Sequence, residues 1–194
     1  MPKLIGDKKV NVAVFISGTG SNFRNLIIHS LKRKSGFNIA LVISNKSKAK
    51  GLIYAREFKI RKRVFCYSNI KITEKKILNE LKKNKINLIC LAGFMKILSK
   101  NFIKNFSGKI LNIHPSLLPK YKGLNTHQRA ISNKEKYSGC TVHYVSSRLD
   151  SGKIILQKKV RILKTDTSNT LAKRILKQEH ILYPKAIKKV LISL

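Results

Sequence analysis

The sequence predicts a single-domain α/β fold in which helices cover both faces of a doubly wound, mostly parallel sheet. Apolar runs rich in Val and Ile occur at residues 10–17, 38–44 and 88–92, which is typical of strands buried on both faces. A helical pattern follows each of them. Two further runs, at 139–145 and 154–162, are joined by a short turn and predict an antiparallel strand pair. With 194 residues, 43% of them hydrophobic, the chain can bury one sizeable core.

The remaining elements complete a Rossmann-like alternation of strands and helices. Two more strands are expected at 63–67 and 109–114, and helices at 23–35, 49–58, 73–84, 100–106 and from Thr170 onward. Thr73 is the expected cap of its helix. Pro184 is expected to bend or interrupt the last helix, because proline has no backbone N–H. Residues 1–194 are expected to form one domain, with residues 1–9 as a short N-terminal extension.

The chain is strongly basic. It has 42 Lys and Arg against 8 Asp and Glu, a formal net charge of +34, so anionic partners are expected and nucleic acid must be considered. The charge is spread along the whole sequence, without an RNP-type aromatic pattern or a zinc knuckle. We therefore favour a general compositional bias and expect no specific nucleic-acid partner. A basic nucleic-acid-binding module is the alternative from another functional class.

The cysteines and the N-terminus indicate where the protein works. Cys66, Cys90 and Cys140 are isolated and odd in number, which favours buried thiols in a reducing compartment over disulfides or a metal site. The first ten residues lack the apolar segment of a signal peptide, and no run approaches membrane-spanning length. We expect a cytoplasmic protein with no membrane partner and no bound metal.

Two polar side chains end the apolar strand at 109–114. Asn112 and His114 are two residues apart, so both point to the same face, and Pro115 ends the strand where they emerge. That carboxyl edge is where open α/β sheets bind ligands. An amide donor, an imidazole and a carboxylate from Asp150 can together stabilise an oxyanion and move a proton, which indicates an acyl-transfer site. Taken alone, each residue could equally serve a strand end or a turn.

A glycine-rich loop, SGTGSN at 17–22, lies between the first strand and the first helix. Glycines allow close approach of the backbone, and free N–H groups at a helix start attract phosphate. Phe23 occupies the third glycine position of a dinucleotide fingerprint, and no Gly-Lys-Ser/Thr ending follows. The loop thus favours a mononucleotide-like phosphate, with a plain tight turn as the alternative.

Five segments carry a family resemblance. They are GTGSN at 18–22, LAGFMKILS at 91–99, LNIHPSLLPKYKG at 111–123, GCTVHYVSSRLDSGKIILQ at 139–157 and QEHILYP at 178–184. Together, and in this order, they resemble the phosphoribosylglycinamide formyltransferase family. The resemblance implies transfer of a formyl group from 10-formyltetrahydrofolate to the amino group of glycinamide ribonucleotide (GAR) in de novo purine biosynthesis, without a metal.

The resemblance also implies residue roles. The catalytic set would be Asn112, His114 and Asp150; the phosphate loop Gly20, Ser21 and Asn22; the ribose contact Glu179; and the folate contacts Met95, Lys96, Ile97 and Leu98 with Asn112. On local grounds Met95 and Leu98 could be ordinary core. Four other histidines, His29, His127, His143 and His180, lack metal-ligand spacing and are expected to be surface or hydrogen-bonded residues.

Some positions depart from the family pattern, and related enzymes remain as alternatives. Lys96 stands where many relatives carry Arg, and the counterpart of the basic residue that relatives direct at the folate is not identified near Ile70. Methionyl-tRNA formyltransferase shares the SLLP segment, but a further domain would be expected after Leu194. Formyltetrahydrofolate deformylase would be expected to carry a regulatory domain before Val10. The sequence leaves open whether the protein is a monomer or a homodimer.

Overall fold

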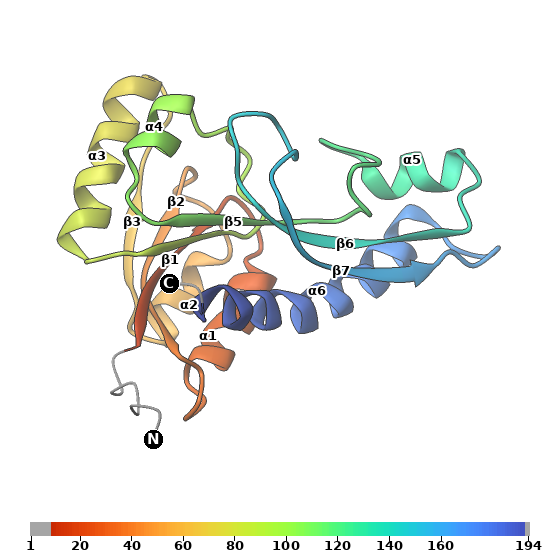
Figure 1. The fold of residues 1–194 in the computed structure, drawn as a ribbon, viewed down its shortest axis with the longest axis horizontal. Helices are drawn as coiled ribbons and strands as arrows, with labels where there is room; N and C mark the ends of the chain where they lie inside the picture. The colour runs from red at the N-terminus through yellow and green to blue at the C-terminus, as the bar shows by residue number, and fades with distance from the viewer. Residues whose placement is uncertain (1–8, 193–194) are drawn as a thin grey trace.

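The computed structural model describes residues 9–192, and Figure 1 shows their arrangement. The expected N-terminal extension thus lies outside the described residues, except for Lys9. The elements along the chain are β1 (Val10–Ile16), α1 (Ser21–Ser30), β2 (Phe37–Ser44), α2 (Leu52–Glu57), β3 (Arg61–Val64), α3 (Ile70–Lys83), β4 (Leu88–Leu91), α4 (Lys100–Asn105), β5 (Lys109–His114), α5 (Thr126–Ser132), β6 (Tyr137–Tyr144), β7 (Ile154–Arg161) and α6 (Ser168–Leu191).

The strands form one seven-stranded sheet in the order β3-β2-β1-β4-β5-β6-β7. Strands β1 to β5 are parallel, whereas β6 is antiparallel to both of its neighbours. The chain runs outward from β1 through β2 to β3 and then returns to β4 on the other side of β1, so the winding reverses between β1 and β4. The predicted fold class is confirmed, and the reversal opens the crevice where such sheets bind ligands.

Helices cover both faces of the sheet, and β1 contributes to both cores. Val12, Val14 and Ile16 face the core formed with α1, α2 and α6. Ala13 and Phe15 face the opposite core, which includes residues of α3 and α4. This alternation explains why the strand is a continuous apolar run. In Figure 1, α3 and α4 lie together on one side, while α1, α2 and α6 lie on the other.

Two helices begin or continue differently from the expectation. Helix α3 starts at Ile70, because the Asn69 side chain accepts the N–H of Ile72 and caps it. The expected cap, Thr73, lies inside the helix, and its hydroxyl donates to the Cys66 carbonyl.

Helix α6 runs through Pro184 without interruption. Proline cannot donate to the carbonyl four residues earlier, that of His180. The Asn25 side chain of α1 donates to this carbonyl at 2.6 Å and so replaces the missing bond. The expected interruption is therefore wrong, because a side chain distant in sequence satisfies the freed carbonyl. None of the helices in the described part of the chain is long and apolar enough to span a bilayer.

Candidate active site

A cavity of about 900 Å³ lies at the carboxyl ends of β1, β4 and β5. It borders the loops after β1 and β4, where the winding reverses, and it extends to the loop between β6 and β7. Every site residue predicted from the sequence lines it: Gly20, Ser21, Asn22, Met95, Lys96, Ile97, Leu98, Asn112, His114, Asp150 and Glu179. Segments far apart along the chain thus meet in one space.

Of the three expected catalytic side chains, Asp150 lies within hydrogen-bonding or ion-pairing range of both others. His114 Nδ1 lies 3.4 Å from Asp150 Oδ2, and Asn112 Nδ2 lies 3.5 Å from Asp150 Oδ1. Asn112 and His114 come from the end of β5, whereas Asp150 comes from the loop between β6 and β7. The side chains of His114 and Asp150 are both buried, so this carboxylate faces the imidazole with little screening by solvent.

Asp150 is held in place by its backbone surroundings as well as by the ring. Its φ angle is +46°, in the left-handed region that aspartate tolerates better than most residues. The backbone N–H of Gly123 donates to Oδ2 at 2.9 Å. The carboxylate therefore has a fixed direction toward both His114 and Asn112.

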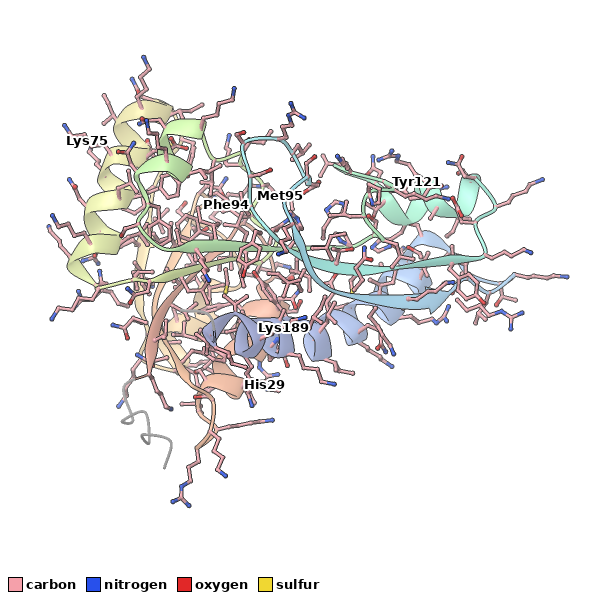
Figure 2. The ribbon with its side chains drawn as sticks, in the orientation of Figure 1. His29, Lys75, Phe94, Met95, Tyr121 and Lys189 are labelled. Carbon is pink, nitrogen blue, oxygen red and sulfur yellow. The ribbon has the colours of Figure 1, made fainter. Side chains whose placement is uncertain are left out.

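The imidazole of His114 is oriented by a main-chain carbonyl. Nε2 lies 2.8 Å from the carbonyl oxygen of Tyr121, and a carbonyl can only accept, so Nε2 carries a hydrogen. Nδ1 then faces Asp150 Oδ2, so each ring nitrogen of His114 lies near an acceptor oxygen. Figure 2 shows Tyr121 near α5.

His143 is a site residue whose importance the sequence reasoning missed. It lies directly opposite Asn112 in the β5–β6 ladder and is only 2% exposed, so of the two alternatives expected for it, a surface residue or a hydrogen-bonded one, the second holds. Nδ1 donates to the Tyr144 carbonyl at 2.8 Å, and burial lowers the pKa of the ring. The neutral ring therefore offers Nε2 as an acceptor to Asn112 Nδ2, at 3.2 Å. The signal in the sequence is the strand register, which pairs the two positions.

The glycine loop is tightly packed at one position and open at another. Gly20 has φ +73° at the start of α1, and a Cβ there would lie 2.7 Å from the Cα of Gly51. A Cβ on Gly18 would meet nothing within 4 Å. The close approach of Gly20 to Gly51 fixes the start of α1, whose first N–H groups have no partner within the helix and belong to residues that line the cavity.

Glu179 reaches this loop from α6. Asn22 Nδ2 donates to Glu179 Oε2 at 2.6 Å, and both side chains are buried. Burial raises the pKa of the Glu179 carboxyl, and the bond from Asn22 opposes that rise only in part. Asn22 Oδ1 is buried and has no partner among the described residues. The pair thus carries one acceptor that still lacks a donor.

The loop after β4 exposes two apolar side chains that line the cavity. Met95 is 56% exposed and Ile97 is 71% exposed, whereas Leu98 is 5% exposed and belongs to the core beneath α3 and α4. The Lys96 Nζ lies 5.9 Å from the centre of the Tyr67 ring. Figure 2 shows Met95 next to Phe94, near the middle of the view. Exposed apolar groups at a cavity wall suit a flat ring system.

The other candidate groups, His127 and the three cysteines, differ in burial. His127 lines the cavity, its Nδ1 has no partner among residues 9–192, and burial together with the His114 charge lowers its pKa. Cys90 and Cys140 are buried as expected, but Cys66 is exposed. Among the described residues no group of three His, Cys, Asp or Glu side chains could hold a metal ion.

The fold and this site define a class of protein: the chain belongs to the formyl transferase family, whose model matches residues 10–187. It is 44% identical over 180 residues to the phosphoribosylglycinamide formyltransferase of Haemophilus influenzae, covering 91% of this chain and 85% of that protein. The structure is similar to the crystal structure of the phosphoribosylglycinamide formyltransferase from Brucella melitensis, with a TM-score of 0.90 and 44% identity over 95% of this chain and 96% of that one.

A longer relative also matches. The chain is 44% identical over 186 residues to part of the human trifunctional purine biosynthetic protein adenosine-3, and this match covers 94% of the chain. The chain spans only 18% of the length of that protein.

Proposed function

We propose that the protein transfers a formyl group from 10-formyltetrahydrofolate to the amino group of GAR, giving formyl-GAR and tetrahydrofolate. The observation that carries this proposal is the meeting of Asn112, His114 and Asp150 in the cavity that also borders the glycine loop. A phosphate held by that loop would bring the remainder of a ribonucleotide along the cavity toward the trio. The names of the relatives agree with this assignment.

The reaction needs charge stabilisation and one proton transfer. The amine nitrogen attacks the formyl carbon, which creates a tetrahedral centre with a negative oxygen and a positive nitrogen. Asn112 can donate one amide hydrogen to that oxygen, because its 3.5 Å contact with Asp150 is too long to hold the hydrogen firmly. His114 as an imidazolium adds positive charge next to the oxyanion. Loss of one such donor typically raises the barrier by roughly 3 kcal/mol.

Asp150 is placed to manage the proton. Its carboxylate faces His114 and can accept the proton of the attacking amine through a water molecule. The C–N bond to the folate nitrogen then breaks, and the same proton passes to that nitrogen as it leaves. His143 acts as a positioning residue in this scheme, because it fixes the direction of the Asn112 amide.

The substrate contacts follow from the two loops. Gly20, Ser21 and Asn22 would hold the phosphate through backbone N–H groups, and Glu179 would accept from a ribose hydroxyl. The exposed side chains of Met95 and Ile97 would cover the pterin ring, with Lys96, Leu98 and Asn112 around it. No step in this scheme requires a metal.

A formyl-transfer assay with three acceptors tests the proposal. Purified protein and 10-formyltetrahydrofolate are incubated with GAR, with charged initiator tRNA or with water alone, and tetrahydrofolate release is measured. We expect release at a useful rate only with GAR. Faster release with the tRNA would favour methionyl-tRNA formyltransferase, and equal release in all three would favour a deformylase.

The setting of the activity is also part of the proposal. We propose that residues 1–194 act as one formyltransferase domain in the cytoplasm, where cysteines such as the exposed Cys66 stay reduced.

Side chains that end in nitrogen project around the whole outline of the molecule, so the positive charge is not concentrated on one part of it (Figure 2). We expect only salt-sensitive, sequence-blind RNA binding. A tight complex at physiological salt would contradict this, and gel filtration would distinguish a monomer from a homodimer.

A further inference from the structure

The two substrate loops diverge at the point where the sheet winding reverses. The backbone N–H of Ala92 donates to the Phe15 carbonyl at 2.9 Å, just beyond the β1–β4 ladder. After this bond, the described backbone shows no further hydrogen bond between the two segments. The glycine loop and residues 93–98 of the loop after β4 then both line the cavity. Any further connection between them must come from side chains.

Ser17 supplies that connection. Its hydroxyl oxygen accepts the backbone N–H of Met95 at 2.7 Å and donates to Asn45 Oδ1 at 2.5 Å. Ser17 is 5% exposed and immediately precedes the glycine loop. Because Asn45 takes the only hydroxyl hydrogen, the lone pairs of the oxygen are directed to Met95. One hydroxyl therefore joins the segments that follow β2, β1 and β4.

The loop at 93–99, whose residues 93–98 line the proposed folate pocket, is called the donor loop below. It is held by few contacts, and the hydrogen bond from the Met95 N–H to Ser17 lies in its exposed part. Phe94 packs edge-on against Phe15, with ring centres 5.2 Å apart, at the start of the loop. Glu74 accepts both the N–H and the hydroxyl of Ser99 at its end. Between them Met95 points its side chain into the open cavity, so its backbone is held mainly by the Ser17 hydroxyl.

We propose that Ser17 is a positioning residue that couples the two substrate sites, an inference that rests on the proposed function. A phosphate bound at 18–22 fixes the backbone next to Ser17 and thereby fixes its hydroxyl. The Met95 N–H and the donor loop are then already ordered when the folate binds. The conformational entropy lost in ordering this loop therefore opposes binding of the first ligand only. The coupling is reciprocal, because two binding equilibria on one protein affect each other equally.

The experiment is calorimetry on the dead-end complex of GAR with tetrahydrofolate, which carries no formyl group to transfer. The coupling factor is the Kd for GAR alone divided by its Kd at saturating tetrahydrofolate. We expect about 5 for the unaltered protein, at the low end of coupling between sites, since a single neutral hydrogen bond carries it. Ser17→Ala should bring the factor close to 1 while both ligands still bind.

Two further variants separate positioning from general stability. The Ser35 hydroxyl is equally buried and donates to the Ser30 and Phe37 carbonyls near the amino end of β2, away from the cavity. Ser35→Ala should lower stability and leave the factor unchanged. Asn45→Ala frees the Ser17 hydroxyl to rotate and should give an intermediate factor, which also serves as the test if Ser17→Ala does not fold.

The outcomes are distinct. A factor of 1 in the unaltered protein, or one that neither Ser17→Ala nor Asn45→Ala lowers, would overturn the coupling while both ligands still bind. If GAR and tetrahydrofolate do not bind to the unaltered protein at all, the proposed function itself fails, and the coupling fails with it.

Discussion

The parallel and antiparallel halves of the sheet contribute different parts of the site. In the parallel half, from β3 to β5, strand ends and glycine turns present backbone N–H groups and loop side chains to the cavity. In the antiparallel half, β6 and its connection to β7 contribute His143 and Asp150. In the proposed scheme the first half binds the substrates, and the second half supplies a carboxylate and a hydrogen-bond acceptor that face Asn112 and His114 on β5. The chemistry therefore depends on the seam between β5 and β6.

The largest expected effect comes from removing the charge that the antiparallel half contributes. Asp150→Asn keeps an acceptor for the Gly123 N–H but loses the carboxylate that faces His114. We expect kcat to fall roughly 10²- to 10⁴-fold, the usual range for a positioned acid–base group, with the KM for GAR little changed. Steady-state kinetics checks this.

A matched control lies in the same half. Asp166 pairs with Arg174 at the start of α6, away from the cavity lining. Asp166→Asn should leave kcat within about twofold of the unaltered enzyme. Similar losses in both variants would indicate a structural role for Asp150 and reject its catalytic assignment.

The next prediction concerns binding in the parallel half. A side chain at Gly18 meets open space, so Gly18→Val should fill the cavity next to the phosphate loop without strain in the fold. We expect the Kd for GAR to rise roughly tenfold or more, because a bulky group blocks close backbone approach, while the Kd for tetrahydrofolate and the Tm stay nearly constant. Calorimetry and thermal melting measure both.

Gly20 is a poor position for the same test. Its φ of +73° and its contact with Gly51 mean that Gly20→Ala strains the backbone, at a cost of about 1–3 kcal/mol in stability. We expect a clearly lower Tm for Gly20→Ala and not for Gly18→Val. If Gly18→Val instead weakened both ligands equally, the division of the cavity into a phosphate end and a folate end would be wrong.

The fold was largely accessible from the sequence because its parallel half has strong local signals. Continuous apolar runs identify β1, β2 and β4, and their alternation with helices predicts a parallel sheet. The strand spacing and residue chemistry pointed to Asn112, His114 and Asp150, but Asn-x-His and an Asp in a turn are weak patterns alone, and the family resemblance was needed to favour a catalytic role over a structural one. Their proximity is a tertiary fact that spacing does not reveal.

The features that were missed depend on partners far away in the sequence. Helix α5 has only seven residues, too short for a clear 3.6-residue period. Asn25 satisfies the carbonyl freed by Pro184 from another helix, so the continuity of α6 could not be read locally. His143 acquired its role from the strand register, which places it opposite Asn112.

A smaller effect is expected at the seam itself. His143→Leu removes the acceptor that directs the Asn112 amide, so the amide can turn away from the oxyanion. We expect kcat to fall up to about tenfold, the equivalent of one neutral hydrogen bond, with little change in either KM.

The control for this variant is a histidine on the opposite side of the molecule. His29 lies on α1, far from the labelled Met95 in Figure 2, and His29→Leu should leave kcat unchanged. A His143→Leu enzyme with normal kcat but raised KM would show that the ring serves binding and not the orientation of Asn112.

The smallest expected effect is on stability, at the contact that joins α6 to the phosphate loop. Burial raises the pKa of Glu179, so the folded state holds its proton more tightly than the unfolded state. The protonated Glu179 side chain therefore makes its full contribution to the free energy of unfolding at low pH. This contribution is lost as the pH rises from the unfolded pKa through the folded pKa. Glu179→Gln has no such loss, and its new amide N–H can reach the unpartnered Asn22 Oδ1.

Glu179→Gln should therefore unfold at a higher temperature than the unaltered protein at pH 8. A gain of about 1 kcal/mol in the free energy of unfolding corresponds to a rise in Tm of about 2–4 °C, and this difference in Tm should narrow toward pH 5. The same change at the exposed Glu57 on α2 should shift Tm little at either pH. GAR binding should weaken in Glu179→Gln, since the amide cannot match a carboxylate as an acceptor for the ribose hydroxyl. If the difference in Tm instead grew toward low pH, the folded state would favour the Glu179 carboxylate. Burial of Glu179 beside Asn22 would then not destabilise the protein at neutral pH.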